Sequence, residues 1–347
     1  MNAEKTSLEK DQEPVCSICI ANFNGGDVLE ACIESVLRQD FAQPVEILVH
    51  DDASTDGSAD IVSKKYPVVH LIRSNTNVGF CVSNNRMAAQ ARGKFILLLN
   101  NDAELHQNAL STLYNYSEKE KVYGIIGLPQ YNKQTGELID VGSLLDPFLN
   151  PIPNLDKLRS NVAMVIGACM WFPKQLWNEL GGFPEWFESI AEDLYLCCLA
   201  RLKGYPVIAL PDSGFDHYVG GSFGGGKVVH GGLRTTYSRR ALSERNKSYV
   251  MILCCPGPLA HILIPLHLLL LTMEGIILSV VMRDKRIWSD IYKSCLQAMW
   301  TRRRELSKLR REIQNKKTAS SRSFYSMHSI VPYKLTMLIR HGLPILK

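Results

Sequence analysis

The chain has 347 residues, of which 46% are hydrophobic and 21% are charged, and its formal net charge is +5 at pH 7. This balance is typical of a globular protein with one large domain or two, and it excludes a disordered or fibrous chain. The charge is uneven, because residues 283–347 carry 16 Lys or Arg against 4 Asp or Glu. A basic region after an acidic body indicates contact with an anionic membrane or with nucleic acid, unless it is simply a solvated tail.

Residues 1–13 are charged and polar, so they predict a flexible N-terminal arm without a secretory signal. We therefore expect a cytoplasmic protein whose ten cysteines stay reduced. Cys16 and Cys19 form a C-x-x-C pair, but positions three apart in a strand point to opposite faces. No second pair is present to complete a zinc site, so we interpret both as packing residues.

Apolar strand patterns alternate with helical patterns through the first two thirds of the chain. The expected strands cover residues 14–24, 45–49, 68–73, 95–99, 124–128 and 206–210. The expected helices cover residues 25–39, 59–65, 83–92, 108–121, 174–180 and 192–202, with loops or a small hairpin over 131–160. This alternation predicts an α/β fold whose mostly parallel sheet is covered by helices on both faces.

Polar side chains follow two of the predicted strands where each strand ends. Asp51 and Asp52 follow one strand, and Asn100, Asn101 and Asp102 follow the apolar run at 95–99. Because parallel strands end at the same edge of a sheet, these groups predict a polar cleft at that edge. A divalent cation that holds a phosphate group would explain the acids, although Asn and Asp are also common in plain turns.

Glu192 and Asp193 open a predicted helix, where acids are favoured by the positive end of the helix dipole. The functional interpretation is a general base that removes a proton from an attacking hydroxyl. Aromatic residues before the pair favour a partly enclosed site: Trp171, Phe172, Phe183, Trp186 and Phe187.

His217 follows a strand and could complete a cation site with Asp102 and diphosphate oxygens, although a lone His is more often structural. The Gly-rich run 220–226, followed by Lys227, lacks the spacing of a phosphate-binding P-loop. We interpret it as a flexible loop that could close over a bound donor.

Five segments, in chain order, resemble the family 2 glycosyltransferases of the GT-A fold, and above all their bacterial rhamnosyltransferase-like branch. The segments are VCSICIANFN, EILVHDDASTDGS, NVGFCVSNN, GKFILLLNNDAEL and GACMWFPKQLWNELGGFPEWFESIAEDLYL, within residues 14–223. The resemblance implies a GT-A fold, which is Rossmann-like with a mostly parallel central sheet flanked by helices. It also implies inverting transfer of a sugar from a nucleotide-diphospho-sugar to a hydroxyl group.

The resemblance assigns roles to residues that match the family motifs. It implies nucleotide-binding positions at Ala21, Phe23, Asp51, Asp52, Asn77 and Asn85. Asp102 matches the last acid of the D-x-D metal motif, and His217 matches a histidine near the metal, so Mg²⁺ or Mn²⁺ is the implied cofactor. Asp193 matches the catalytic base, with Glu192 beside it. Asn100 replaces the first acid of D-x-D, which puts strict metal dependence in question.

Residues 259–282 are strongly apolar and long enough to span a bilayer, but they contain Pro265, His267 and Glu274. Basic residues follow at once, beginning with Arg283 and Lys285. We expect one or two interfacial helices on anionic lipid, with a single crossing or a buried core helix as alternatives.

The expected organisation has an arm (1–13), a GT-A catalytic domain (14–245), membrane-associated helices (246–300) and a basic tail (301–347). The expected partners are a nucleotide-sugar donor, a glycan or lipid-linked acceptor and an anionic membrane surface, and no nucleic acid. We expect a peripheral or monotopic protein on the inner face of the cell membrane. The donor is expected to be dTDP-rhamnose or a UDP-sugar, with GDP-mannose left open.

Three other functions would each leave a different pattern in the sequence. A sugar nucleotidyltransferase would carry a Gly-rich basic signature near the N-terminus, and a processive synthase would carry Q-x-x-R-W and several membrane spans; neither pattern is visible. A catalytically degenerate nucleotide-sugar-binding or scaffold protein remains open because of Asn100. The presence of Asp52, Asp102 and Asp193 together argues against that alternative.

Overall fold

A seven-stranded sheet lies at the centre of the computed structural model, which describes residues 13–218, 227–229 and 232–346. In spatial order its strands are β12 (Val207–Ala209), β6 (Ile125–Gly127), β11 (Cys169–Pro173), β4 (Phe95–Asn100), β1 (Cys16–Asn22), β2 (Val45–Asp51) and β3 (Val69–Arg73). Only β11 runs antiparallel to its neighbours in this sheet. The predicted α/β fold with a mostly parallel sheet is thus confirmed.

The central strands are buried on both faces, as their continuous apolar sequences predict. In β1, Ile18 and Ile20 point into one core and Cys19 points into the other. Cys16 lies on the face opposite Cys19, and all ten cysteines are free and buried. Both cysteines of the C-x-x-C pair therefore serve as packing residues.

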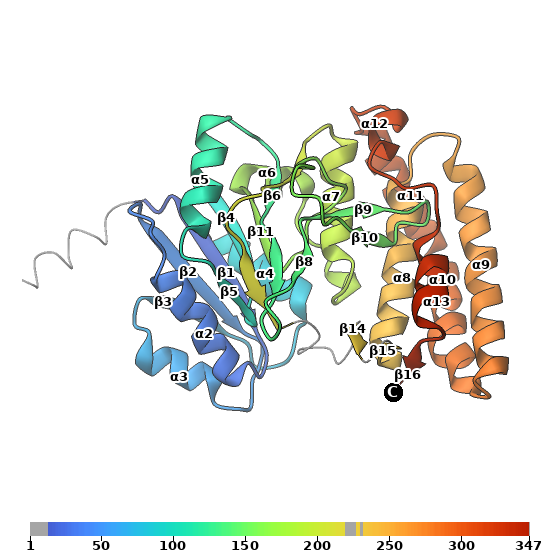
Figure 1. Ribbon diagram of the computed structural model, residues 1–347, viewed down its shortest axis with the longest axis horizontal. Helices are drawn as coiled ribbons and strands as arrows, with labels where there is room; N and C mark the ends of the chain where they lie inside the picture. The colour runs from blue at the N-terminus through green and yellow to red at the C-terminus, as the bar shows by residue number, and fades with distance from the viewer. Residues whose placement is uncertain (1–12, 219–226, 230–231, 347) are drawn as a thin grey trace, which may run out of the picture.

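Helices cover both faces of the sheet (Figure 1). One face packs against α2 (Gly26–Leu37), α3 (Ser58–Lys65) and α5 (Ala109–Lys119). The other packs against α4 (Phe80–Gln90), α6 (Lys174–Leu180) and α7 (Glu192–Leu202). A 3₁₀ turn, η1 (Glu185–Phe187), precedes α7. The predicted helices are confirmed, with ends that differ by a few residues.

Short strands fill the region where loops or a small hairpin were expected. One small sheet has the order β5 (Ala103–Leu105), β13 (Phe215–His217), β7 (Gln130–Asn132) and β8 (Leu138–Asp140). A second consists of β9 (Ser143–Leu145) and β10 (Pro151–Pro153). The antiparallel pairing of β13 with β5 places His217 opposite Ala103, next to Asp102 in the chain.

The C-terminal third forms a helical layer beside the sheet (Figure 1). Its helices are α8 (Tyr237–Cys254), α9 (Ala260–Val281), the π-helical η2 (Ile287–Lys293), α10 (Ser294–Thr301), α11 (Arg303–Asn315), α12 (Ser321–Tyr325) and α13 (Tyr333–His341). A small sheet joins β14 (Lys227–Val229), β15 (Gly232–Thr235) and β16 (Ile345–Leu346). The core on the α7 side of the sheet continues into these helices.

Two expected boundaries look different in the structure. The limit between residues 245 and 246 falls inside α8, which is a continuous helix packed on α7. The expected basic tail contains three helices, α11 to α13, rather than a solvated extension. The helical layer is therefore built onto the sheet domain through a shared core and not through a linker.

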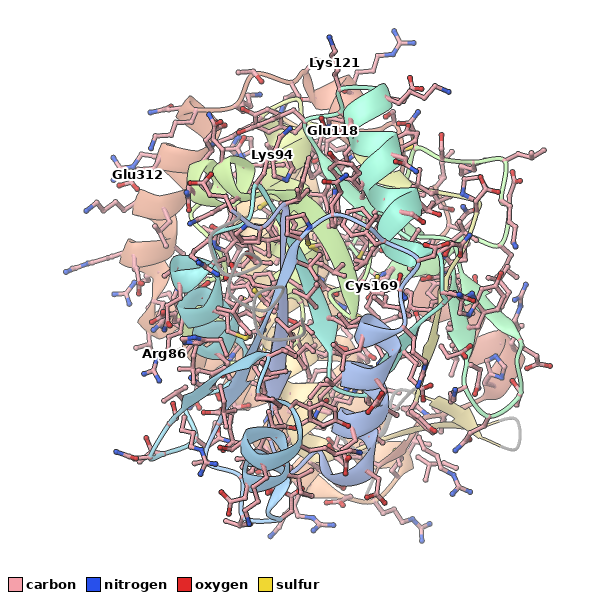
Figure 2. The ribbon with its side chains drawn as sticks, turned by 90° about the vertical axis from the view of Figure 1, so that its left-hand side faces the viewer. Arg86, Lys94, Glu118, Lys121, Cys169 and Glu312 are labelled. Carbon is pink, nitrogen blue, oxygen red and sulfur yellow. The ribbon has the colours of Figure 1, made fainter. Side chains whose placement is uncertain are left out.

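Surface charges mark the amino ends of the strands. Lys94, just before β4, donates to Glu118 Oε1 of α5 over 2.6 Å (Figure 2). Both side chains are exposed, so the pair contributes little to stability. The polar residues predicted to form the cleft lie at the other end of β4.

Replacement of Trp171 by Ala is expected to lower the free energy of unfolding by about 3–5 kcal/mol, because a large buried ring leaves a cavity. Trp171 is fully buried, stacks on Phe95 at 4.8 Å between ring centroids and donates from Nε1 to Ser117 Oγ over 2.9 Å. Urea denaturation followed by circular dichroism measures the change. Trp300→Ala is the control, since Trp300 is 69% exposed, and equal losses in both variants would contradict this prediction.

Candidate active site

A cleft of about 660 Å³ opens beyond the carboxyl ends of β1, β2 and β4. The parallel register aligns these ends, because Ala21 lies opposite both His50 and Asn100. Eight of the ten residues singled out from the sequence line this cleft: Ala21, Phe23, Asp52, Asn77, Asp102, Glu192, Asp193 and His217. The predicted polar cleft is therefore present at the predicted edge.

Asp52 organises the side of the cleft formed by β1 and β2. Its Oδ1 accepts the backbone N–H of Val78 over 2.7 Å and its Oδ2 accepts that of Gly79 over 2.8 Å. These bonds hold the loop that contains Asn77 against the end of β2. Phe23 is 52% exposed at the rim, where its ring is available to stack on a flat ligand such as a nucleobase.

Asp51 and Asn85 do not line the cleft, although both were expected to bind the nucleotide. Asp51 accepts hydrogen bonds from the Asn22 side chain at 3.0 Å and from the Ser54 backbone at 3.2 Å. Asn85 bonds both backbone groups of Phe183 at 2.9 and 3.0 Å. Both side chains bond to protein groups beside the cleft, and their expected nucleotide-binding role stays a prediction.

Asp102 and His217 lie together in the lining of the cleft. Asp102 Oδ1 and His217 Nε2 are 3.0 Å apart, and His217 Nδ1 is 2.7 Å from the side-chain nitrogen of Gln130. With the Gln130 amide as donor to Nδ1, the ring proton sits on Nε2 and is donated to Asp102. Rotation of that amide would move the proton to Nδ1 and leave Nε2 available as a metal ligand.

The metal-ligating atoms that line the cleft fit a cation that takes its other ligands from a bound substrate. In the part of the chain that the structure describes, no group of three or more His, Cys, Asp or Glu side chains could hold a metal by itself. Asp102 and His217 supply one carboxylate and one imidazole, and the buried Asn100 Oδ1 has no hydrogen-bond partner. Mg²⁺ and Mn²⁺ are commonly held by one or two protein ligands together with phosphates and water. The set therefore suits a cation that bridges to a diphosphate.

A strained loop precedes Glu192 and Asp193, which also line the cleft. Glu188, Ile190 and Ala191 have φ angles of +66°, +72° and +67°, which residues other than Gly rarely adopt. Asn246 of α8 is fully buried and holds this loop. Its side-chain amide donates to the backbone carbonyls of Phe187, Ser189 and Ile190 over 2.8 to 2.9 Å.

The two acids have different surroundings. Burial raises the pKa of Asp193, but its Oδ2 and Oδ1 accept backbone N–H bonds from Gly167 at 3.1 Å and Leu194 at 2.7 Å, which favour the carboxylate. Burial, assisted by the charge of Asp193, raises the pKa of Glu192 to about 8. Glu192 Oε2 has no hydrogen-bond partner. At neutral pH the proton of the pair therefore resides mainly on Glu192.

Three residues of α8 line the cleft and were not found from the sequence. Arg239, Ser243 and Lys247 are four residues apart and so share one face of the helix. Burial lowers the pKa of Arg239. The nearby carboxylates of Glu192 and Asp193 act in the opposite direction and favour the charged guanidinium. The spacing is visible in the sequence, but nothing there indicates that this face of α8 meets the cleft.

The Gly-rich run 220–226 lies outside the described residues, so its expected role as a closing loop stays a prediction. Lys227 begins β14.

Residues 17–181, nearly half of the chain, match the family model described as Glycosyl transferase family 2. A poly(ribitol-phosphate) beta-glucosyltransferase of Bacillus spizizenii is 28% identical over 58% of this chain and 31% of its own length. The Escherichia coli UDP-Glc:alpha-D-GlcNAc-diphosphoundecaprenol beta-1,3-glucosyltransferase WfaP is 33% identical over 31% of this chain and 43% of its own. The chain spans 25% to 34% of the length of the first three curated relatives.

Solved structures show the same fold over most of the chain. Residues 1–349 of S. aureus TarS align with a TM-score of 0.55 and 17% identity over 90% of this chain and 89% of that one. The mannosyltransferase PcManGT of Pyrobaculum calidifontis, solved with GDP-Man and Mn²⁺, aligns with a TM-score of 0.51 and 15% identity over 87% and 86%. Residues 17–181 are thus similar to the family 2 glycosyltransferases, and the fold of the chain is GT-A. The matches do not single out the rhamnosyltransferase-like branch.

Glu192→Gln is expected to raise the melting temperature at pH 9 by about 5–10 °C and to change it little at pH 5. The pKa of Glu192 is raised from 4.5 to about 8 in the folded chain, so the folded state binds the proton more tightly than the unfolded state does. Wild-type stability therefore falls as pH rises from about 4.5 to about 8, and Gln cannot ionise. Scanning calorimetry at both pH values measures this, and a larger gain at pH 5 would contradict it.

Proposed function

We propose that the chain is an inverting glycosyltransferase that moves a sugar from a nucleotide-diphospho-sugar to a hydroxyl group. One observation carries the proposal: a single cleft, in a chain that is similar to the family 2 glycosyltransferases, is lined by both the Asp102–His217 pair and the Glu192–Asp193 pair. The first pair suits a diphosphate with its cation. The second suits an acceptor hydroxyl that must lose a proton.

The proposed donor is a sugar linked to UDP or dTDP. S. aureus TarS has been solved with UDP, and WfaP is named for a UDP-Glc donor, which supports a pyrimidine nucleotide. The resemblance to rhamnosyltransferases keeps dTDP-rhamnose in the proposal. Phe23 would stack on the base, while Asp52 keeps the loop at Asn77 in place beside it.

In this mechanism Asp193 takes the proton from the acceptor hydroxyl as the acceptor oxygen bonds to the anomeric carbon. The bond from that carbon to the diphosphate breaks on the opposite side, so the configuration inverts and no enzyme-linked sugar forms. A divalent cation held by Asp102 and His217 would supply the positive charge that stabilises the departing diphosphate. The protonated Glu192 can donate a hydrogen bond into the cleft, and Arg239 keeps the acid pair from accumulating uncompensated charge.

The proposed acceptor is a hydroxyl of a glycan or lipid-linked glycan in cell-surface polysaccharide synthesis. The names of two relatives support it, since one acts on poly(ribitol-phosphate) and the other on a diphosphoundecaprenol-linked sugar. Residues 14–245 would contain most of the catalytic cleft, and the helices from residue 246 onward would hold the protein on the inner face of the cell membrane. The cleft extends slightly beyond residue 245, because Lys247 of the helical part also lines it.

Titration calorimetry with UDP, dTDP and GDP, each with and without Mn²⁺, tests the donor. We expect one pyrimidine nucleotide to bind the wild type at least tenfold more tightly with Mn²⁺ present, and Asp102→Ala to remove this gain, because the cation loses its carboxylate ligand. Asp60→Ala, on the surface beside Arg73, is the control. If no nucleotide binds under any condition, the transferase proposal fails and the scaffold alternative replaces it.

Asp193→Asn is expected to lower kcat by about 10²- to 10⁴-fold and leave nucleotide affinity unchanged, since an amide cannot accept the proton. The rate is measured as sugar transfer to purified membrane glycolipid. The donor is a sugar linked to the nucleotide that calorimetry identifies. The matched variant Asp212→Asn changes an exposed carboxylate and should keep full activity. Wild-type turnover in Asp193→Asn would assign the base to another residue.

A further inference from the structure

One face of α9 is exposed and apolar along the whole helix. The helix has 22 residues, about 33 Å at 1.5 Å per residue, and it lies at the outer edge of the helical layer (Figure 1). The large exposed side chains are Ile262, Leu266, Leu269, Leu270, Met273, Ile276, Ile277, Val280 and Val281. A soluble monomer rarely exposes a continuous apolar surface of this length, so another phase or molecule is expected to cover it.

The opposite face of α9 is fixed to the rest of the protein by polar bonds. His267 Nε2 is 2.8 Å from Ser248 Oγ of α8. Glu274, the one charged residue of α9, accepts from Arg240 of α8 over 2.6 Å and from Lys334 of α13 over 2.7 Å. The charge that argued against a membrane helix in the sequence therefore points inward, away from the exposed face.

A close approach between helices fixes α9 further. A Cβ atom at Gly275 would lie 2.5 Å from the Tyr292 ring of η2, so the two helices touch where only Gly fits. Of the helices in the described residues, α9 alone is long and apolar enough to cross a membrane. Yet a crossing would carry α8, with Arg240 and the buried Glu244, into hydrocarbon, which is costly for charges. The packing is compatible with α9 lying flat.

Elements next to α9 also expose side chains that are typical of a membrane interface. Lys334 links α13 to α9, and α13 exposes Leu335, Leu338 and Ile339. Trp300 and Arg303 line a groove of about 1070 Å³ together with residues of α9, and the Arg303 guanidinium lies 4.4 Å from the Trp300 ring centroid. Exposed basic residues follow α9 directly: Arg283, Lys285 and Arg286. Apolar side chains beside Trp, Lys and Arg match the chemistry of an anionic lipid interface.

We propose that the exposed faces of α9 and α13, with Trp300, form a membrane-docking surface that lies in the plane of an anionic bilayer and does not cross it. This surface is called the α9–α13 face below. The inference rests on the proposed function in one respect, namely that the acceptor is presented at a membrane. A second copy of the chain could also cover an apolar face, but the basic residues at the C-terminal end of α9 favour anionic lipid, because the one acid of α9, Glu274, is already paired with Arg240 and Lys334 and is not available to a second copy.

Flotation of the full chain with vesicles tests the α9–α13 face. The probes are vesicles of phosphatidylcholine alone and of phosphatidylcholine with an equal amount of phosphatidylglycerol. We expect binding to the anionic vesicles that weakens with salt, and a loss of at least tenfold in Leu269→Glu/Ile276→Glu, since charges would enter the acyl region. Leu158→Glu is the matched control, because Leu158 is 95% exposed but lies in a loop of the sheet domain.

Nucleotide affinity and the melting temperature are measured on the same variants. Loss of vesicle binding with both properties intact supports the α9–α13 face. If the wild type binds nucleotide but does not bind vesicles, the proposed membrane-docking role of the α9–α13 face is wrong, while the proposed function is unaffected. A dimeric wild type that becomes monomeric in Leu269→Glu/Ile276→Glu, without any change in vesicle binding, overturns lipid in favour of a second copy.

Cysteine labelling distinguishes an in-plane helix from a crossing. His261→Cys and Lys285→Cys place thiols beyond the two ends of the exposed face, and all ten native cysteines are buried. A membrane-impermeant maleimide is added to inside-out membrane vesicles that contain each variant. We expect both positions to be labelled from the cytoplasmic side, whereas labelling at one end only would overturn the in-plane arrangement.

Discussion

The parallel pairing of β1 with β2 and β4 is the constraint on which the rest of the site depends. It brings the polar ends of three strands to one edge, where Asp52 and Asp102 lie in the same cleft. Continuous burial of the strands makes a shift in register costly, because both faces of the sheet are packed. The positions of Asp52 and Asp102 are thus set by the packing of the core and not by the loops themselves.

Helix α8 connects this cleft to the outer helices. Asn246 holds the strained loop before α7, and Lys247 lines the cleft while bonding Glu244 over 3.0 Å. Glu244 also bonds Lys334 of α13 over 2.6 Å. Polar contacts therefore run from Lys247 in the cleft lining through Glu244 to Lys334 of α13, so the same helix contacts both the cleft and the outer helices.

Local sequence determined much of this protein. Buried runs such as 95–99 define strands, and short polar segments define where those strands end, so the α/β fold and the edge of the cleft could be predicted. Asp52, Asp102 and Asp193 could be located because each stands at the end of a strand or the start of a helix. The sequence did not show that Asp51 and Asn85 bond to neighbouring protein groups and lie outside the cleft lining, because those partners come from other segments of the chain.

Only the tertiary structure decided which distant residues meet. His217 reaches Asp102, 115 residues away, through the pairing of β13 with β5, and short strands of this kind carry little sequence signal. Arg239, Ser243 and Lys247 share a helix face in the sequence, but docking of α8 on α7 turns that face to the cleft. For α9, the sequence established length and apolarity, while the inward ion pairs of Glu274 decided which face stays exposed. The physical reason is common to all three: periodicity is local, whereas contacts across the fold depend on packing between segments far apart in the chain.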